Sequence, residues 1–161
     1  MIGRASLLTL FALALGSCSQ MIPIHAGFEH GKLVFTGDDT QVRSHPWCLG
    51  EFAVVGEDGV DAWRFEVPLA ILESKRSCGP NLPIIYGDSP REAKVITPAR
   101  PLEHGKLYFI TGHAGDSYDG AFRYEKQTVV QRRVINVTSD IATRNRALGF
   151  DKMFENNAEA E

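Results

Sequence analysis

The stretch LGEFAVVGEDGVDAWRFEV, residues 49–67, decides the fold class of this chain. A run of apolar residues is followed by the turn-forming sequence of residues 56–59, and a second run then alternates apolar and charged side chains. In residues 60–67, three apolar residues fall on one face, namely Trp63, Phe65 and Val67. Arg64 and Glu66, the charged residues between them, fall on the other. Alternation with period two is typical of a half-buried strand, so the stretch predicts a β-hairpin.

The same pattern recurs along the rest of the chain, where short apolar or alternating runs are separated by Gly, Pro and Asp. No stretch with the helical period that alternating β-α units would require interrupts these runs. The pattern therefore predicts about eight strands, at residues 32–36, 49–55, 60–67, 84–86, 92–96, 106–111, 121–126 and 128–137.

Strands at this spacing predict an all-β domain, either an antiparallel β-sandwich of immunoglobulin-like architecture or a small barrel. The order Cys48, Trp63, Cys78 is similar to that of immunoglobulin domains, but the cysteines lie closer together than in that family and no tyrosine stands two residues before the second one. Beyond the strands, residues 138–148 predict a short helix that ends at Gly149, followed by an acidic tail.

Length and composition are those of one globular domain. The chain has 161 residues, of which 43% are hydrophobic and 23% charged, and its formal net charge is −3. Arg132 and Arg133 stand together in a predicted strand, where we expect them to lie on a solvated face. Nothing else in the charge pattern indicates a phosphate-binding surface, so no nucleic-acid partner is expected.

The N-terminus has the order of an export signal. One positive charge, Arg4, precedes an uncharged run of eleven residues at positions 5–15. That run fits the apolar core of a signal peptide, which takes about 7–15 residues, and is shorter than the roughly 20 residues of a membrane-spanning helix.

The residues that follow, Leu15-Gly16-Ser17-Cys18, resemble the lipobox of bacterial lipoprotein precursors. The resemblance implies that Cys18 receives a diacylglycerol, that a peptidase cuts before it, and that its new amine is acylated, giving a stable anchor. Loss of Arg4 with the leader takes the net charge from −3 to −4. Because Ser19 rather than aspartate follows Cys18, the resemblance also implies sorting to the outer membrane, facing the periplasm.

Two cysteines remain once Cys18 is assigned to the anchor. In an exported, oxidising compartment an even pair predicts a disulfide, so we expect Cys48 to be bonded to Cys78. Neither cysteine belongs to a motif with zinc-ligand spacing, and no cofactor is expected.

Residues 112–120, GHAGDSYDG, carry the densest group of reactive side chains and predict an exposed loop. Its functional interpretations are contact with a partner, a hard cation shared by two aspartates, or hydrolytic chemistry. The stretch from Ser117 to Tyr124 also resembles the Ser/Gly/Tyr loop of lipoproteins that inhibit lysozyme. The candidate contact residues are His113, Asp116, Ser117, Tyr118 and Asp119.

The expected organisation is a signal peptide at residues 1–17, a spacer at 18–28, a β-domain at 29–137, and a short helix with an acidic tail at 138–161. The expected function is that of a membrane-tethered, non-enzymatic module that binds an envelope partner or supports envelope structure. The alternatives are a periplasmic inhibitor or ligand-binding protein and a metal-dependent hydrolase that uses the 112–120 loop.

Overall fold

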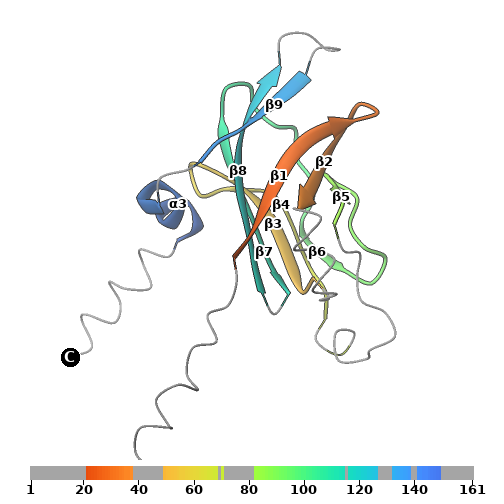
Figure 1. The fold of residues 1–161 in the computed structure, drawn as a ribbon. Helices are drawn as coiled ribbons and strands as arrows, with labels where there is room; N and C mark the ends of the chain where they lie inside the picture. The colour runs from red at the N-terminus through yellow and green to blue at the C-terminus, as the bar shows by residue number, and fades with distance from the viewer. Residues whose placement is uncertain are drawn as a thin grey trace, which may run out of the picture.

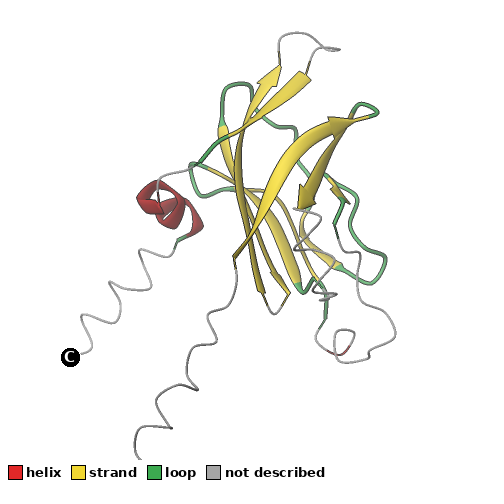
Figure 2. Cartoon of the chain, in the orientation of Figure 1, coloured by secondary structure: helices red, strands yellow, loops and turns green. Residues whose placement is uncertain are grey.

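A computed structural model of the chain describes residues 21–37, 49–68, 70, 82–114, 116–126, 132–138 and 141–149. In these residues a single sheet, curled into a half-barrel, is accompanied by one short helix (Figures 1 and 2). The elements are β1 (Met21–Glu29), β2 (Lys32–Gly37), β3 (Glu51–Gly56), β4 (Asp61–Glu66), β5 (Ile84–Ile85), β6 (Lys94–Thr97), β7 (Leu107–Ala114), β8 (Asp116–Lys126), β9 (Arg132–Asn136) and α3 (Ile141–Leu148).

The all-β prediction is confirmed, and each of the eight predicted strands overlaps one of the strands β2 to β9. The order across the sheet is β5-β2-β1-β8-β7-β3-β4-β6, and β9 pairs with β8. The hairpin that decided the fold class is the β3–β4 pair, in which Phe52 lies opposite Phe65 and Val54 opposite Trp63.

The core lies on the concave face of the curled sheet. Phe52 is fully buried at its centre, with ring centroids 5.3 Å from Phe35, 5.7 Å from Trp63 and 5.8 Å from Phe65. Phe35 belongs to β2, which is separated from β3 by three strands in the sheet order. The ring contact between them therefore closes the curl over an aromatic interior.

Residues 21–28, which the sequence assigned to a spacer, form most of β1, so that part of the prediction is wrong. Ile22, Ile24 and Ala26 alternate as buried residues. Because β1 pairs with β8 in parallel, the expectation of a purely antiparallel fold is also wrong. The alternation is visible in the sequence, but the partner that makes it a strand lies far along the chain.

The prediction of a loop at residues 112–120 is also wrong, because β7 and β8 form a hairpin there with residue 115 between them. The two glycines that suggested a turn instead allow close approach. A Cβ on Gly112 would lie 3.2 Å from the backbone oxygen of Glu51, and one on Gly120 would lie 2.2 Å from that of Ile24. These glycines mark crowded strand crossings, which the sequence alone does not distinguish from turns.

One edge of β8 serves two neighbours in succession. Its first half pairs with β1 and its second half with β9. Where β1 and β9 diverge, the side chain of Asn136 accepts a hydrogen bond from Ala26 N at 2.7 Å and donates one to Ala26 O at 2.9 Å. Asn136 thus satisfies backbone groups of β1 that no longer face a strand.

The predicted short helix is confirmed as α3, and Gly149 ends it with a φ of +76°. Ala147 packs with Phe109 and Ala121 on the convex face of the sheet, and Arg144 Nε donates to Asp119 Oδ1 at 2.6 Å. Within the described ranges, no helix is long and apolar enough to cross a membrane.

Candidate functional site

A cavity of about 300 Å³ opens beside the turn from β1 into β2. This turn lies at one end of the half-barrel (Figure 1). We call this cavity the mouth pocket. Its walls come from the β1–β2 hairpin, the segment that follows β5, and the connection between β6 and β7. The last wall is formed by the paired ends of β8 and β9. The lining residues are Phe28, Leu33, Tyr86, Arg100, Pro101, Leu102, Tyr124, Lys126 and Arg132.

The floor of the mouth pocket is apolar and aromatic. Leu33 and Tyr124 are buried, and the Phe28 and Tyr124 rings lie 6.5 Å apart. Phe28 and Leu33 face each other across β1 and β2 because His30 and Gly31 form a two-residue turn, with φ values of +50° and +77°. Pockets of this kind at barrel mouths are common small-molecule sites.

Tyr86 fixes one wall. Its hydroxyl oxygen lies 2.8 Å from the carbonyl oxygen of Arg100 and 3.1 Å from that of Ala62. Burial raises the pKa of Tyr86 to about 12, so the hydroxyl keeps its proton and can donate well above neutral pH. Since Tyr86 follows β5 and Ala62 lies in β4, the contact joins segments near the two ends of the sheet order.

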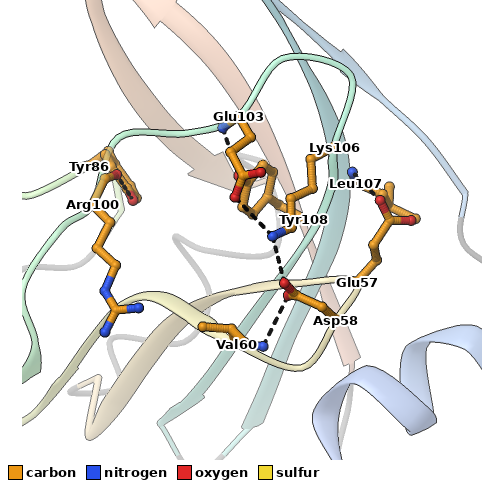
Figure 3. A network of polar contacts seen from close by, with 9 residues as sticks. All are labelled: Glu57, Asp58, Val60, Tyr86, Arg100, Glu103, Lys106, Leu107 and Tyr108. Carbon is orange, nitrogen blue, oxygen red and sulfur yellow. Dashed lines mark hydrogen bonds and ion pairs between the residues drawn. The ribbon is translucent and has the colours of Figure 1, made fainter.

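A network of polar contacts braces the turn that follows the same wall (Figure 3). Lys106 Nζ lies 2.7 Å from Asp58 Oδ2 and 3.1 Å from Glu103 Oε1, and the Tyr108 hydroxyl accepts a hydrogen bond from Glu103 N at 2.9 Å. The hydrogen bond between Lys106 and Asp58 lowers the pKa of Asp58 and raises the pKa of Lys106. These contacts hold the turn at residues 103–106 against the β3–β4 turn.

One exposed cation stands over the apolar floor, and two further residues of the lining are cationic. The Arg132 guanidinium lies 5.6 Å from the centroid of the Phe28 ring, and its Nη2 donates to Gly31 O at 3.2 Å. The backbone nitrogen of Lys126 donates to His104 Nδ1 at 3.0 Å, which fixes the chain where the Lys126 side chain leaves it. Arg100 adds a third positive charge, and the described lining contains no carboxylate.

The pairing of Arg132 with the pocket was missed by the sequence analysis, which placed both adjacent arginines on a solvated face. Both are exposed, but successive residues of β9 point to opposite faces, and only Arg132 lines the pocket. The strand period could separate the two arginines. It could not show that Phe28, about a hundred positions earlier, would lie beneath one of them.

The predicted contact residues do not form one site. His113 and Ser117 lie opposite each other in the β7–β8 hairpin and line a second cavity of about 280 Å³ together with Glu51 and Arg64. Arg64 is committed to ion pairs with Glu51 and Asp61. The sheet therefore brings His113 and Ser117 together, beside a carboxylate that already has a cationic partner.

Strand alternation separates Tyr118 from that pair, whereas Asp119 lies on the same face as Ser117 but is bound by another side chain. Tyr118 points to the core and is only 6% exposed, whereas Asp119 is bound by Arg144 on the convex face. Asp116 is the first residue of β8. The segment on which the inhibitor and hydrolase hypotheses relied is thus a pair of strands, with its tyrosine in the interior.

The remaining predictions concern metal binding and the three cysteines. In the part of the chain that the structure describes, no three His, Cys, Asp or Glu side chains are grouped as metal ligands. The predicted anchor Cys18 and the predicted disulfide between Cys48 and Cys78 lie outside the described residues.

No known protein family, curated protein or solved structure matches this chain.

Proposed function

We propose that this protein is a membrane-tethered, non-enzymatic binding module of the cell envelope, and that the mouth pocket is its ligand site. Lipidation at Cys18 supplies the tether, and the sorting residue Ser19 favours the outer membrane, facing the periplasm. The proposal for the pocket is carried by one observation, an aromatic floor at the mouth of the half-barrel with the exposed Arg132 guanidinium above it and two further cationic residues in the lining.

The composition of the lining supports binding rather than catalysis. Its described members provide apolar surface, two tyrosines and three cations. They include no serine, cysteine, histidine or carboxylate, the groups that most often act as nucleophile or general base. The cavity lies at the lower end of the volume range of small-molecule sites, which is about 300–1,000 Å³. A ligand of modest size, or the end group of a larger one, fits it.

The architecture that we propose is the small barrel rather than the sandwich. The rings of Phe35 in β2 and Phe52 in β3 contact each other across the interior. The hydroxyl of Tyr86, which follows β5, donates a hydrogen bond to a carbonyl oxygen of β4. Both contacts support a sheet that bends round towards its own far edge. A pocket at the open end is the expected consequence of such curvature.

Filling the pocket tests the ligand site. We expect Leu102→Trp to reduce binding of 4-fluorophenyl phosphate at least tenfold, because the indole would occupy the space beside a half-buried leucine. Binding is measured by ¹⁹F NMR on the full lipidated chain in nanodiscs of neutral lipid, with empty nanodiscs as background.

The matched control is Val60→Trp, which adds the same indole at an exposed valine that does not line the pocket. This variant should bind the probe like the wild type. Equal binding by wild type and Leu102→Trp would show that the mouth pocket is not the ligand site.

Replacing the proposed anchor residue tests the tether. We expect labelled palmitate to enter the wild-type protein and not Cys18→Ser, and the unlipidated variant to leave the membrane fraction or remain as the uncut precursor, because several acyl chains are needed for stable attachment. Cys48→Ser serves as the control for general loss of a cysteine and should still be labelled. Labelling of Cys18→Ser at the wild-type level would refute the tether.

A further inference from the structure

The mouth pocket carries a local charge opposite to that of the molecule as a whole. The chain has a net charge of −3, yet the charged residues of the lining are Arg100, Lys126 and Arg132. In the described residues, none of these three side chains lies within 4.0 Å of a carboxylate. Three cations without a carboxylate partner among the described residues favour an anion over a neutral or cationic ligand.

The position of Arg132 also indicates where an anion would sit. Arg132 stacks over the Phe28 ring, so its guanidinium is held at the boundary between the apolar floor and solvent. A ligand whose apolar part rests on Phe28 and Tyr124 would place its polar head beside Arg132. Guanidinium groups bind carboxylate and phosphate through two parallel hydrogen bonds, which makes either oxyanion a fitting head group.

The direction of β1 determines which end of the domain faces the membrane. Met21, at the start of β1, lies opposite Ser117, whereas Phe28 lies in the mouth pocket seven residues further on. Seven residues of strand span about 23 Å. The chain from the anchor at Cys18 to Met21 is three residues long and spans at most about 11 Å. With the tether at Cys18, the start of β1 would be the membrane-proximal end. The turn from β1 into β2, beside the mouth pocket, lies at the other end of the strand (Figure 1).

We propose that the mouth pocket binds the carboxylate or phosphate group of a ligand with a short apolar body, and that this ligand arrives from the side facing away from the anchoring membrane. The inference rests on the proposed function, since it needs the tether and the pocket. It adds the charge of the ligand, the place of its head group beside Arg132, and its source, which is the aqueous space rather than the head groups of the membrane to which the protein is attached.

Three fluorinated probes of similar size test the charge preference: 4-fluorophenyl phosphate, 4-fluorobenzoate and the neutral 4-fluorobenzyl alcohol. Their affinities for the full lipidated chain in neutral nanodiscs are compared by ¹⁹F NMR. We expect the preferred anion to bind at least fivefold more tightly than the alcohol, and the order of the two anions to identify the head group. Equal affinities, each abolished by Leu102→Trp, would overturn the inference and leave the proposed function standing. No binding sensitive to Leu102→Trp would overturn both.

Removing the rim charges gives a second readout. Lys126→Ala/Arg132→Ala should weaken binding of the preferred anion about tenfold and leave the alcohol unchanged, because exposed charge pairs each contribute modestly. The double variant Lys94→Ala/Arg133→Ala is the matched control. It removes the same charge from two exposed residues outside the pocket and should bind like the wild type. An equal loss in both double variants would mean that net charge, and not the pocket, attracts the anion.

Orientation is tested with a nanodisc lipid that carries a gadolinium chelate on its head group. Methyl signals of Ile22 should broaden, and those of Leu33 and Leu102 at the mouth pocket should stay sharp. Broadening of the mouth-pocket methyl groups, together with loss of probe binding in nanodiscs that contain phosphatidylglycerol, would assign the site to a head group of the anchoring membrane and overturn the proposed source.

Discussion

Phe52→Ala is expected to lower the free energy of unfolding by about 3–5 kcal/mol, the usual cost of deleting a fully buried aromatic ring. The Phe52 side chain is 0% exposed and contacts the rings of Phe35, Trp63 and Phe65. The substitution removes the ring that connects β2 with the β3–β4 hairpin across the interior. The surrounding strands are held in register by the sheet, so they fill the space only in part and a cavity remains.

The measurement is chemical denaturation of the full chain, followed by circular dichroism and by tryptophan fluorescence. A natural domain has a stability of about 5–15 kcal/mol, so the loss is a large fraction of the total and lowers the melting temperature by about 10 °C. Val95→Ala, which truncates a valine that is 45% exposed, is the control and should change stability by less than about 0.5 kcal/mol. A Phe52→Ala protein as stable as this control would contradict the aromatic core.

Gly120→Ala is expected to destabilise the protein by about 2–3 kcal/mol or more, although it adds only one methyl group. The new Cβ would lie 2.2 Å from the backbone oxygen of Ile24 and 3.1 Å from its carbonyl carbon. Since the clash is with backbone, no side-chain rotation relieves it. Either β1 or β8 must move, and the parallel pairing of the two strands is the contact that is lost.

Hydrogen exchange identifies which strand moves. Backbone amides of β1 should exchange much faster in Gly120→Ala, while those of β3 and β4 should keep most of their protection. The control is Gly27→Ala, also in a strand of this crossing, where an added Cβ meets nothing within 4 Å. That variant should be within about 1 kcal/mol of wild type. If both alanine variants behaved alike, the close approach of β1 to β8 would be wrong.

The fold class was predictable because it depends on local patterns. The hairpin at residues 49–67 and the short helix before Gly149 both appear where the spacing of apolar and turn-forming residues places them. The prediction of a loop at residues 112–120 was wrong because it depends on contacts with distant segments. Gly112 and Gly120 are residues typical of turns. Here their lack of a side chain allows the backbone of Glu51 and of Ile24 to come close, and local sequence does not reveal that contact.

The candidate site was not predictable in the same way. The mouth pocket combines Phe28, Leu102 and Arg132, residues from three distant parts of the chain, and each of them looks ordinary in its own segment. The reactive group that did stand out, at residues 113–119, is divided by strand alternation between the core and the convex face. Successive side chains of a strand point in opposite directions, so a dense run of functional groups along it is split between two faces.

The sequence by itself determined that the described domain is built of β-strands, and it led to the expectation of an anchor at Cys18. Both follow from short-range information, namely the period of the apolar residues and the order of charge, apolar run and cysteine. Only the tertiary structure decided that β1 joins the sheet in parallel, that the sheet curls into a half-barrel, and that Arg132 stands over Phe28 at the end away from residue 21. These features depend on which strands pair, and pairing is selected by burial and backbone hydrogen bonds summed over the whole sheet.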